Sequence, residues 1–172
     1  MTLNRVPRIV AVFALVFLLQ EALINRISFF IGGFSLYLAF FIVWVMQEER
    51  SSAVVTGFIA GFIADFSPTL EAPFGLWSFV YTVVAYVIAN NVRSALDADM
   101  SPVTISLVTV FGSFSASIMF LISGAILGQE VGSAGYVLRE LFGNSLWTLL
   151  LSPLYGPLAI KLYRATLTAR SR

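Results

Sequence analysis

The sequence predicts an all-α integral membrane protein, folded as a six-transmembrane-helix bundle. Composition is the first reason, because 59% of the 172 residues are hydrophobic and only 11% are charged, whereas about a quarter of the residues in soluble domains are charged. The second reason is charge spacing, which leaves six apolar windows separated by short polar turns. Almost nothing remains for a soluble module, so residues 1–172 are expected to form a single membrane domain.

The expected helices follow these windows and the chain breakers between them. A helix needs about 20 apolar residues to cross a bilayer. Gly32 and Gly33 precede the second helix, and Pro102 suits the first turn of the fifth. The start of the second helix is the least defined, and a short interfacial segment over residues 26–34 is the open alternative. The predicted helices cover approximately residues 8–25, 33–47, 51–67, 74–92, 102–127 and 141–163.

Basic residues predict the orientation in the membrane, because cytoplasmic loops are enriched in Lys and Arg. With both termini in the cytoplasm, only Arg26 and Arg139 of the ten basic residues lie outside. The opposite orientation reverses this bias, so we expect cytoplasmic N- and C-termini. We also expect the first span to remain uncleaved, since the sequence QEALINR after it offers no small-x-small cleavage site.

Several function classes are disfavoured by composition. The chain has no Cys and no His, which removes disulfides, thiol nucleophiles and imidazole acid–base chemistry. Phosphate-binding glycine loops, HExxH and GxSxG motifs are also missing from the sequence. The two acids within spans, Glu21 and Asp65, lie on one side of the bilayer, which does not provide a proton path across it. We therefore predict no enzymatic activity, no cofactor, no metal ion and no nucleic-acid partner.

Small residues at four-residue spacing define one face of the third helix. Gly57, Gly61 and Asp65 lie on this face, and small residues let membrane helices approach closely. Asp65 falls in the outer third of the bilayer, where a carboxylate needs a partner or water; a solvated carboxylate at the interface and pairing with Arg26 or Arg139 are the open alternatives. Packing within the bundle and contact with another protein are both consistent with this face.

The last two spans carry further polar and small residues. Gly112 and Ala116 form a second small face in the fifth helix, for which helix packing is expected. In the sixth helix Asn144 is a buried-amide candidate, and Pro153 frees a carbonyl and bends the helix. A simple kink and a ligand site at a broken helix are both compatible with this pattern.

Two stretches carry a family resemblance. In the first, Gly61 and Asp65 precede Gly75, which opens the segment GLWSFVYTVVAYVIANNVR with Tyr86 near its cytoplasmic end. The second is the final span, NSLWTLLLSPLYGPLAIKLYR, which begins at Asn144 and is followed by basic residues. Together with chain length and short loops, these stretches resemble the rod shape-determining protein MreD family. The candidate packing or partner-contact residues are Gly57, Gly61, Asp65, Gly75, Tyr86, Asn144 and Pro153.

The resemblance implies a multi-pass protein of the bacterial plasma (inner) membrane, surrounded by lipid. It implies a non-catalytic scaffold that organises lateral peptidoglycan synthesis, with an MreC-like protein as partner and MreB and the RodA/penicillin-binding-protein synthase nearby. A homo-oligomer is left open. The family fold is also similar to the substrate-binding S component of energy-coupling-factor transporters, so uptake of a vitamin or metal is the alternative function. The three-residue spacing of Ala11 and Ala14 departs from the AxxxA stripe expected of such components.

Overall fold

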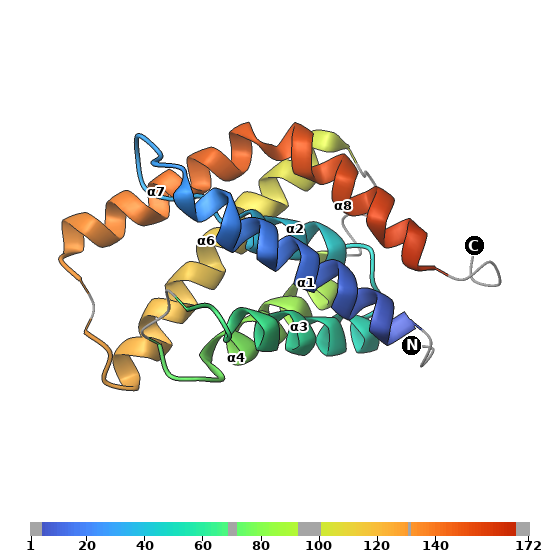
Figure 1. Ribbon diagram of the computed structural model, residues 1–172, viewed down its shortest axis with the longest axis horizontal. Helices are drawn as coiled ribbons and strands as arrows, with labels where there is room; N and C mark the ends of the chain where they lie inside the picture. Colours follow the sequence, from blue (N-terminus) through green and yellow to red (C-terminus); the bar gives the residue numbers. More distant parts are fainter. Residues whose placement is uncertain (1–4, 69–71, 93–100, 131, 168–172) are drawn as a thin grey trace.

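The computed structural model describes residues 5–68, 72–92, 101–130 and 132–167, and within these ranges the protein is helical with no strands (Figure 1). This confirms the predicted all-α class. The long elements are α1 (Val6–Ala22), α2 (Leu36–Val45), α3 (Arg50–Ala64), α4 (Leu76–Val87), α6 (Pro102–Ile126), α7 (Ala134–Leu150) and α8 (Ser152–Thr166). A 3-10 turn, η2 (Ile24–Arg26), follows α1, and a π-helical turn, η3 (Ile88–Val92), extends α4. Three residues used to predict the orientation, Arg93, Arg170 and Arg172, lie outside the described ranges.

Two helices of the described chain are long and apolar enough to cross a bilayer. They are Val6–Arg26, which combines α1 with η2, and α6. The segments Leu36–Val45, Arg50–Ala64 and Leu76–Asn91 are apolar but shorter. A ten-residue helix such as α2 rises only about 15 Å, roughly half the thickness of the hydrocarbon core. The count of six crossings therefore stays a prediction.

Helix α2 forms the centre of the molecule. Residues 37–45 are all buried, and α2 packs against α1, α3, α6 and α8. A helix that is apolar on every side has no face that favours water, and in α2 other helices cover it. Aromatic rings fill the contact with α1, where the Phe13 ring meets the Trp44 ring edge-on with centroids 5.3 Å apart.

Helices α3 and α4 lie side by side and pack through the small-residue face (Figure 1). A Cβ added to Gly57 would lie 2.8 Å from the Cβ of Ala85, and one added to Gly61 would lie 2.5 Å from the Cα of Ser78. Carbon atoms do not approach this closely without displacement, so only glycine fits at these two positions. The contact between α3 and α4 is therefore a contact between backbones.

The second helix begins later than expected. Its first residue is Leu36 rather than residue 33, and residues 27–35 form an irregular segment that is not helical. Gly32 has a φ of +58°, a conformation that favours glycine. Its neighbour α7 leaves no room for a side chain, because a Cβ on Gly32 would lie 3.0 Å from the Cα of Gly143. Residues 27–35 are therefore held as an ordered turn against α7.

The single helix expected over residues 141–163 is two helices in the structure. Helix α7 begins at Ala134, and Ser133 caps it by accepting a hydrogen bond from the Tyr136 amide. The helix is interrupted at Leu151, which lies between α7 and α8. Pro153 lies in the first turn of α8, where its missing N–H costs no hydrogen bond. Pro153 thus begins a helix instead of bending one, and Pro157 is the proline inside α8.

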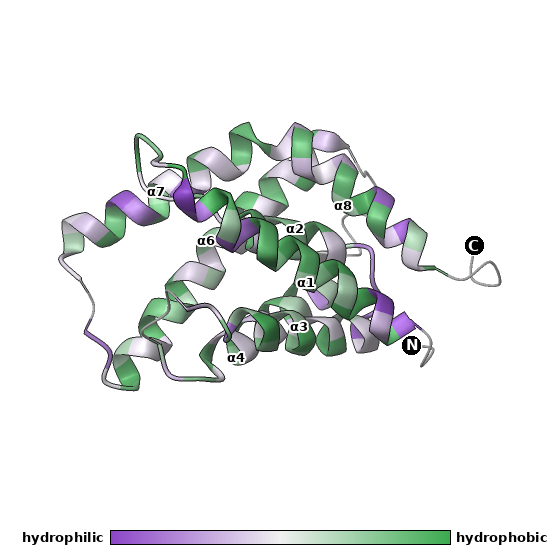
Figure 2. Cartoon of the chain, viewed as in Figure 1, coloured by the Kyte–Doolittle hydropathy of each residue, from purple (hydrophilic) through white to green (hydrophobic). Residues whose placement is uncertain are grey.

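Apolar side chains remain on the outside of the molecule. Helix α6 exposes Phe111 and Ile126, at 68% and 79% of their surface, and α1 exposes Leu18 at 61%. Hydrophilic residues gather at the start of α1 and the α2–α3 turn on one side, and at the end of α1 and in α7 on the other (Figure 2). An apolar exterior between polar ends is the pattern that lipid requires.

Candidate functional site

Asp65 caps the first turn of α4. Its Oδ1 accepts the Trp77 N–H at 2.9 Å, and its Oδ2 accepts the Ser78 N–H at 3.1 Å and the Ser78 hydroxyl. Neither of the possible partners, Arg26 and Arg139, pairs with Asp65, because the one ion pair found among the described residues joins Arg5 to Glu48. The free N–H groups of a helix start satisfy a carboxylate without a cation, so Asp65 is bound by backbone.

Two other candidates of this helix pair lie at its opposite ends. Gly75 precedes α4 with a φ of +97°, and a Cβ placed there would meet no atom within 4 Å, so backbone conformation is what favours glycine there. Near the other end, the Tyr86 hydroxyl accepts a hydrogen bond from Arg50, whose guanidinium carbon lies 4.6 Å from the Tyr86 ring centroid. Both residues fix the ends of the α3–α4 pair.

Asn144 holds the irregular segment 27–35 against α7. Its Oδ1 accepts the Ser35 N–H at 3.0 Å, and one turn earlier the Glu140 Oε2 accepts the Gly33 N–H at 3.0 Å. One turn later the Trp147 indole donates to the Ile31 carbonyl at 3.0 Å. The spacing of these residues places them on one face of α7. Their side chains pair with backbone groups of segment 27–35 that would be hydrogen-bonded within the segment if it were helical.

Gln20 of α1 holds the same segment from the other side. Its amide nitrogen donates to the Phe34 carbonyl at 3.2 Å and to Asn25, and its oxygen accepts the Tyr37 N–H at 3.3 Å. A buried glutamine thus satisfies the backbone on both sides of the α2 start. Segment 27–35 is fixed between α1 and α7.

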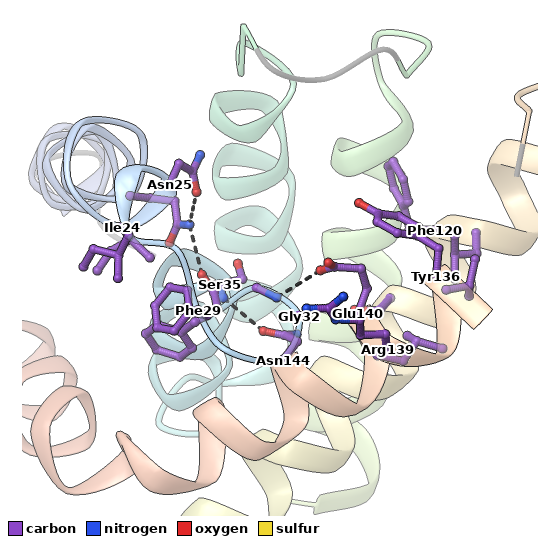
Figure 3. A pocket seen from close by; sticks show the side chains of 18 of the residues that line it. Ile24, Asn25, Phe29, Gly32, Ser35, Phe120, Tyr136, Arg139, Glu140 and Asn144 are labelled. Atoms are coloured by element: carbon purple, nitrogen blue, oxygen red, sulfur yellow. Dashed lines mark hydrogen bonds between the residues drawn. The ribbon is translucent and has the colours of Figure 1, made fainter. Parts of the chain in front are cut away.

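These contacts form the rim of a pocket of about 920 Å³ (Figure 3). Segment 27–35 borders it together with Trp77 of α4, Phe120 of α6 and residues of α7. The Trp77 and Phe120 rings stack with centroids 4.2 Å apart. Helix α7 contributes the two charged lining residues, Arg139 and Glu140, and the amide of Asn144, and the other amides and hydroxyls come mainly from α1, segment 27–35 and the residues between them. Its size lies within the range of small-molecule sites, about 300–1,000 Å³.

A second polar cluster lies at the opposite end of α1. Arg5 donates to Glu48 at 2.8 Å, in the turn between α2 and α3, and also lies over the ring of Tyr163 in α8. Burial raises the pKa of Glu48 above its ordinary value of 4.5, and hydrogen bonds and the Arg5 charge oppose this shift only partly. The cluster joins the start of α1, the α2–α3 turn and the end of α8.

Within the described ranges, no group of three His, Cys, Asp or Glu side chains lies close enough to hold a metal ion. Several of the described acids make structural contacts. Asp65 caps α4, Glu140 binds the Gly33 amide, and Glu21 accepts hydrogen bonds from Ser67 and Asn25.

Comparison with protein families gives one match, to the model of rod shape-determining protein MreD, over residues 5–165. The chain belongs to the MreD family. This family is a non-catalytic, shape-determining family of the bacterial cell envelope membrane. Searches of curated proteins and of solved structures returned no match. Because the match covers both the α3–α4 pair and the pocket, these features lie within the MreD-family part of the chain.

Sequence reasoning missed most residues of this MreD-family pocket. The last predicted helix begins at residue 141 and so leaves out Arg139 and Glu140, and Gln20, Trp77 and Phe120 received no role, although all five line the pocket. One signal was available, since Glu140, Asn144 and Trp147 follow the spacing of a helix face. The first half of this helix was not predicted, because Arg139 and Glu140 are charged and the predicted spans were drawn from charge-free windows.

Proposed function

We propose that the chain is a non-catalytic scaffold of the bacterial elongation complex, helping to maintain rod shape by organising lateral peptidoglycan synthesis. The observation that carries this proposal is the match to the rod shape-determining family over residues 5–165. A protein that binds partners presents its contact surface best on rigid elements. The closely packed α3–α4 pair and segment 27–35, which is hydrogen-bonded to α1 and α7, are such rigid elements.

The proposed location is the plasma membrane, crossed six times with both termini in the cytoplasm. The first described helix begins and the last ends on the same side of the molecule, which fits an even number of crossings (Figure 1). Arg5, Lys161 and Arg164 lie in these end regions, and basic residues favour the cytoplasmic side. The Arg5–Glu48 cluster then lies at the inner surface and the pocket toward the outer one.

The proposed partners are an MreC-like scaffold protein and, through it, MreB and the RodA/penicillin-binding-protein synthase. Outward apolar surface is available for contact with other membrane helices. On α3, Phe58 and Phe62 are exposed, and the rings of Phe62, Phe66 and Phe74 pack edge-on to one another. Aromatic side chains are enriched in protein interfaces, and lipid covers those faces that no partner occupies.

Depletion of the protein in its rod-shaped host tests this function. We expect cells to become wide or round as the protein is lost, and to recover their shape on re-expression. Cell width and the pattern of new wall synthesis, followed with a fluorescent D-amino acid, are the readouts. Normal width and normal wall insertion after complete depletion would contradict the proposal.

The pocket favours the second candidate function, the S component of an uptake system. Its volume is adequate for a vitamin-sized solute. An uptake component predicts that the purified protein retains a vitamin or metal at near-stoichiometric amount, and that solute entry falls when the protein is depleted. Scaffold function predicts a shape defect with unchanged solute entry, so the two depletion readouts separate the candidates.

A further inference from the structure

The pocket contains a hydrogen-bond donor and an acceptor that the fold does not use. The Oδ1 of Asn144 accepts the Ser35 N–H and the Oε2 of Glu140 accepts the Gly33 N–H. Within the described chain, the Nδ2 of Asn144 and the Oε1 of Glu140 have no hydrogen-bond partner, while both residues line the pocket and are half-buried. One face of α7 therefore offers one donor and one acceptor a single turn apart.

Aromatic walls lie on two sides of this polar pair. Figure 3 shows Glu140 and Asn144 between Phe29 on one side and Phe120 and Tyr136 on the other. Trp77 stacks on Phe120, and Phe29 packs against Trp147 with ring centroids 5.1 Å apart. Aromatic side chains favour stacked or edge-on contact with another ring, so these walls suit a flat molecule.

Charge in the pocket is balanced. Arg139 and Glu140 line it side by side in the sequence and carry opposite charges, and the other polar lining residues are amides and hydroxyls. Arg139 also donates to the Phe30 carbonyl at 3.3 Å, which holds its charge at the rim. A net-neutral site in a largely apolar surround favours an uncharged ligand, because an unpaired charge would lose its hydration there.

We infer that this pocket binds an uncharged, planar heteroaromatic molecule through an amide-like edge. The ligand accepts from the Asn144 amide and donates to the free Glu140 oxygen, as a lactam edge does, while its ring lies against the aromatic walls. This is a binding activity separate from the scaffold role. The ligand would bridge segment 27–35, α4, α6 and α7, so its arrival would stabilise their mutual packing.

Lumichrome, the bare tricyclic ring of flavins, is a suitable probe because it is planar, uncharged and fluorescent and carries lactam edges. The full chain, purified in mild detergent, is titrated with lumichrome, and fluorescence quenching and anisotropy are recorded against empty micelles. We expect saturable binding at one equivalent per chain. Partition equal to that of empty micelles, without saturation, would overturn the inference.

Isosteric variants test the polar edge. Asn144→Asp keeps the oxygen that accepts from Ser35 but replaces the free donor by an acceptor, and Glu140→Gln keeps the acceptor for Gly33 but replaces the free acceptor by a donor. Each is expected to weaken lumichrome binding about tenfold, since one hydrogen bond is lost and a polar group is left unmatched. The double variant has the donor at residue 140 and the acceptor at residue 144. A lactam can match this arrangement by binding in the flipped orientation, so we expect lumichrome to bind the double variant more tightly than it binds either single variant.

Two further variants complete the test. Trp77→Leu removes one aromatic wall without touching the polar edge, and it is expected to abolish most of the quenching. Glu130→Gln makes the same charge change as Glu140→Gln at an exposed position outside the pocket lining, and it should leave binding unchanged. The thermal unfolding midpoint of each variant checks folding. Wild-type affinity in the folded Asn144→Asp, Glu140→Gln and Trp77→Leu variants would assign the binding elsewhere and overturn the inference.

Discussion

Asp65 lies in an apolar stretch because the start of α4 supplies its hydrogen bonds. The Trp77 and Ser78 amides point at the carboxylate, and the helix macrodipole favours a negative charge at this end. An acid in a membrane segment ordinarily indicates a cation or a transported ion nearby. Here the geometry indicates a helix cap contributed by the preceding helix.

Replacement of Asp65 tests this cap. Asp65→Ala should lower the free energy of unfolding by about 1–2 kcal/mol, as loss of a capping side chain does, and Asp65→Asn should lower it less because one oxygen acceptor remains. Denaturation of the detergent-solubilised protein measures both. Glu130→Ala, at an exposed position, is the control and should have little effect. Equal stability of Asp65→Ala and the wild type would show that the cap contributes nothing.

Glu48 is expected to make stability depend on pH. Its pKa is raised in the folded protein above the ordinary value of 4.5, so the folded state binds the proton more tightly than the unfolded state does. This contribution is fully present below pH 4.5 and is lost as pH rises through the raised pKa. Relative to Glu48→Gln, the wild type should gain thermal stability as pH falls from about 7 toward 4.5.

The comparison with Glu48→Gln cancels the titration of the other acids, which the two proteins share. The readout is the difference between the two unfolding midpoints at each pH. A difference that stays constant, or one that moves against the wild type on acidification, would contradict the raised pKa.

At the scale of elements, the α3–α4 pair shows what a periodic pattern does and does not specify. Four-residue spacing of Gly57 and Gly61 predicts a small face, and this face does lie against a neighbouring helix. The spacing cannot name that neighbour, because lipid, another protein and α4 all accept small residues. The choice of α4 depends on the cap at Asp65 and on the Gly75 turn, which bring the chain directly back.

Gly61→Ala tests the close approach. The new Cβ would contact the Trp77 carbonyl and lie 2.5 Å from the Ser78 Cα, and backbone atoms cannot move aside as a flexible side chain can. We expect a loss of about 1–3 kcal/mol in unfolding free energy, typical of overpacking. Gly156→Ala in α8 is the matched control, since its Cβ would meet no atom within 4 Å. It should be neutral or slightly stabilising, and equal effects of both changes would contradict a close α3–α4 contact.

At the scale of the whole molecule, composition predicts the fold class because apolar content and charge spacing are properties of the entire chain. The sequence predicts helix boundaries less well where side chains, and not a helix, satisfy the backbone polar groups. Segment 27–35 relies on Gln20, Glu140 and Asn144, which are distant in sequence. The first half of α7 carries charged residues, and a prediction based on charge-free apolar windows therefore places this part of the chain in a loop. Gln20, Glu140 and Asn144 also line the pocket. Because they are far apart in the sequence, the sequence alone did not indicate that they form one site.

Affinity purification from the native membrane in mild detergent, with identification of the co-eluting proteins, tests the scaffold proposal most directly. We expect recovery of an MreC-like protein, together with MreB or the RodA/penicillin-binding-protein synthase, in wild-type and Glu130→Ala preparations. We also expect reduced recovery with Gly61→Ala, in proportion to its loss of stability. Recovery of the ATP-hydrolysing subunits of an uptake system, with no shape-determining protein, would contradict it.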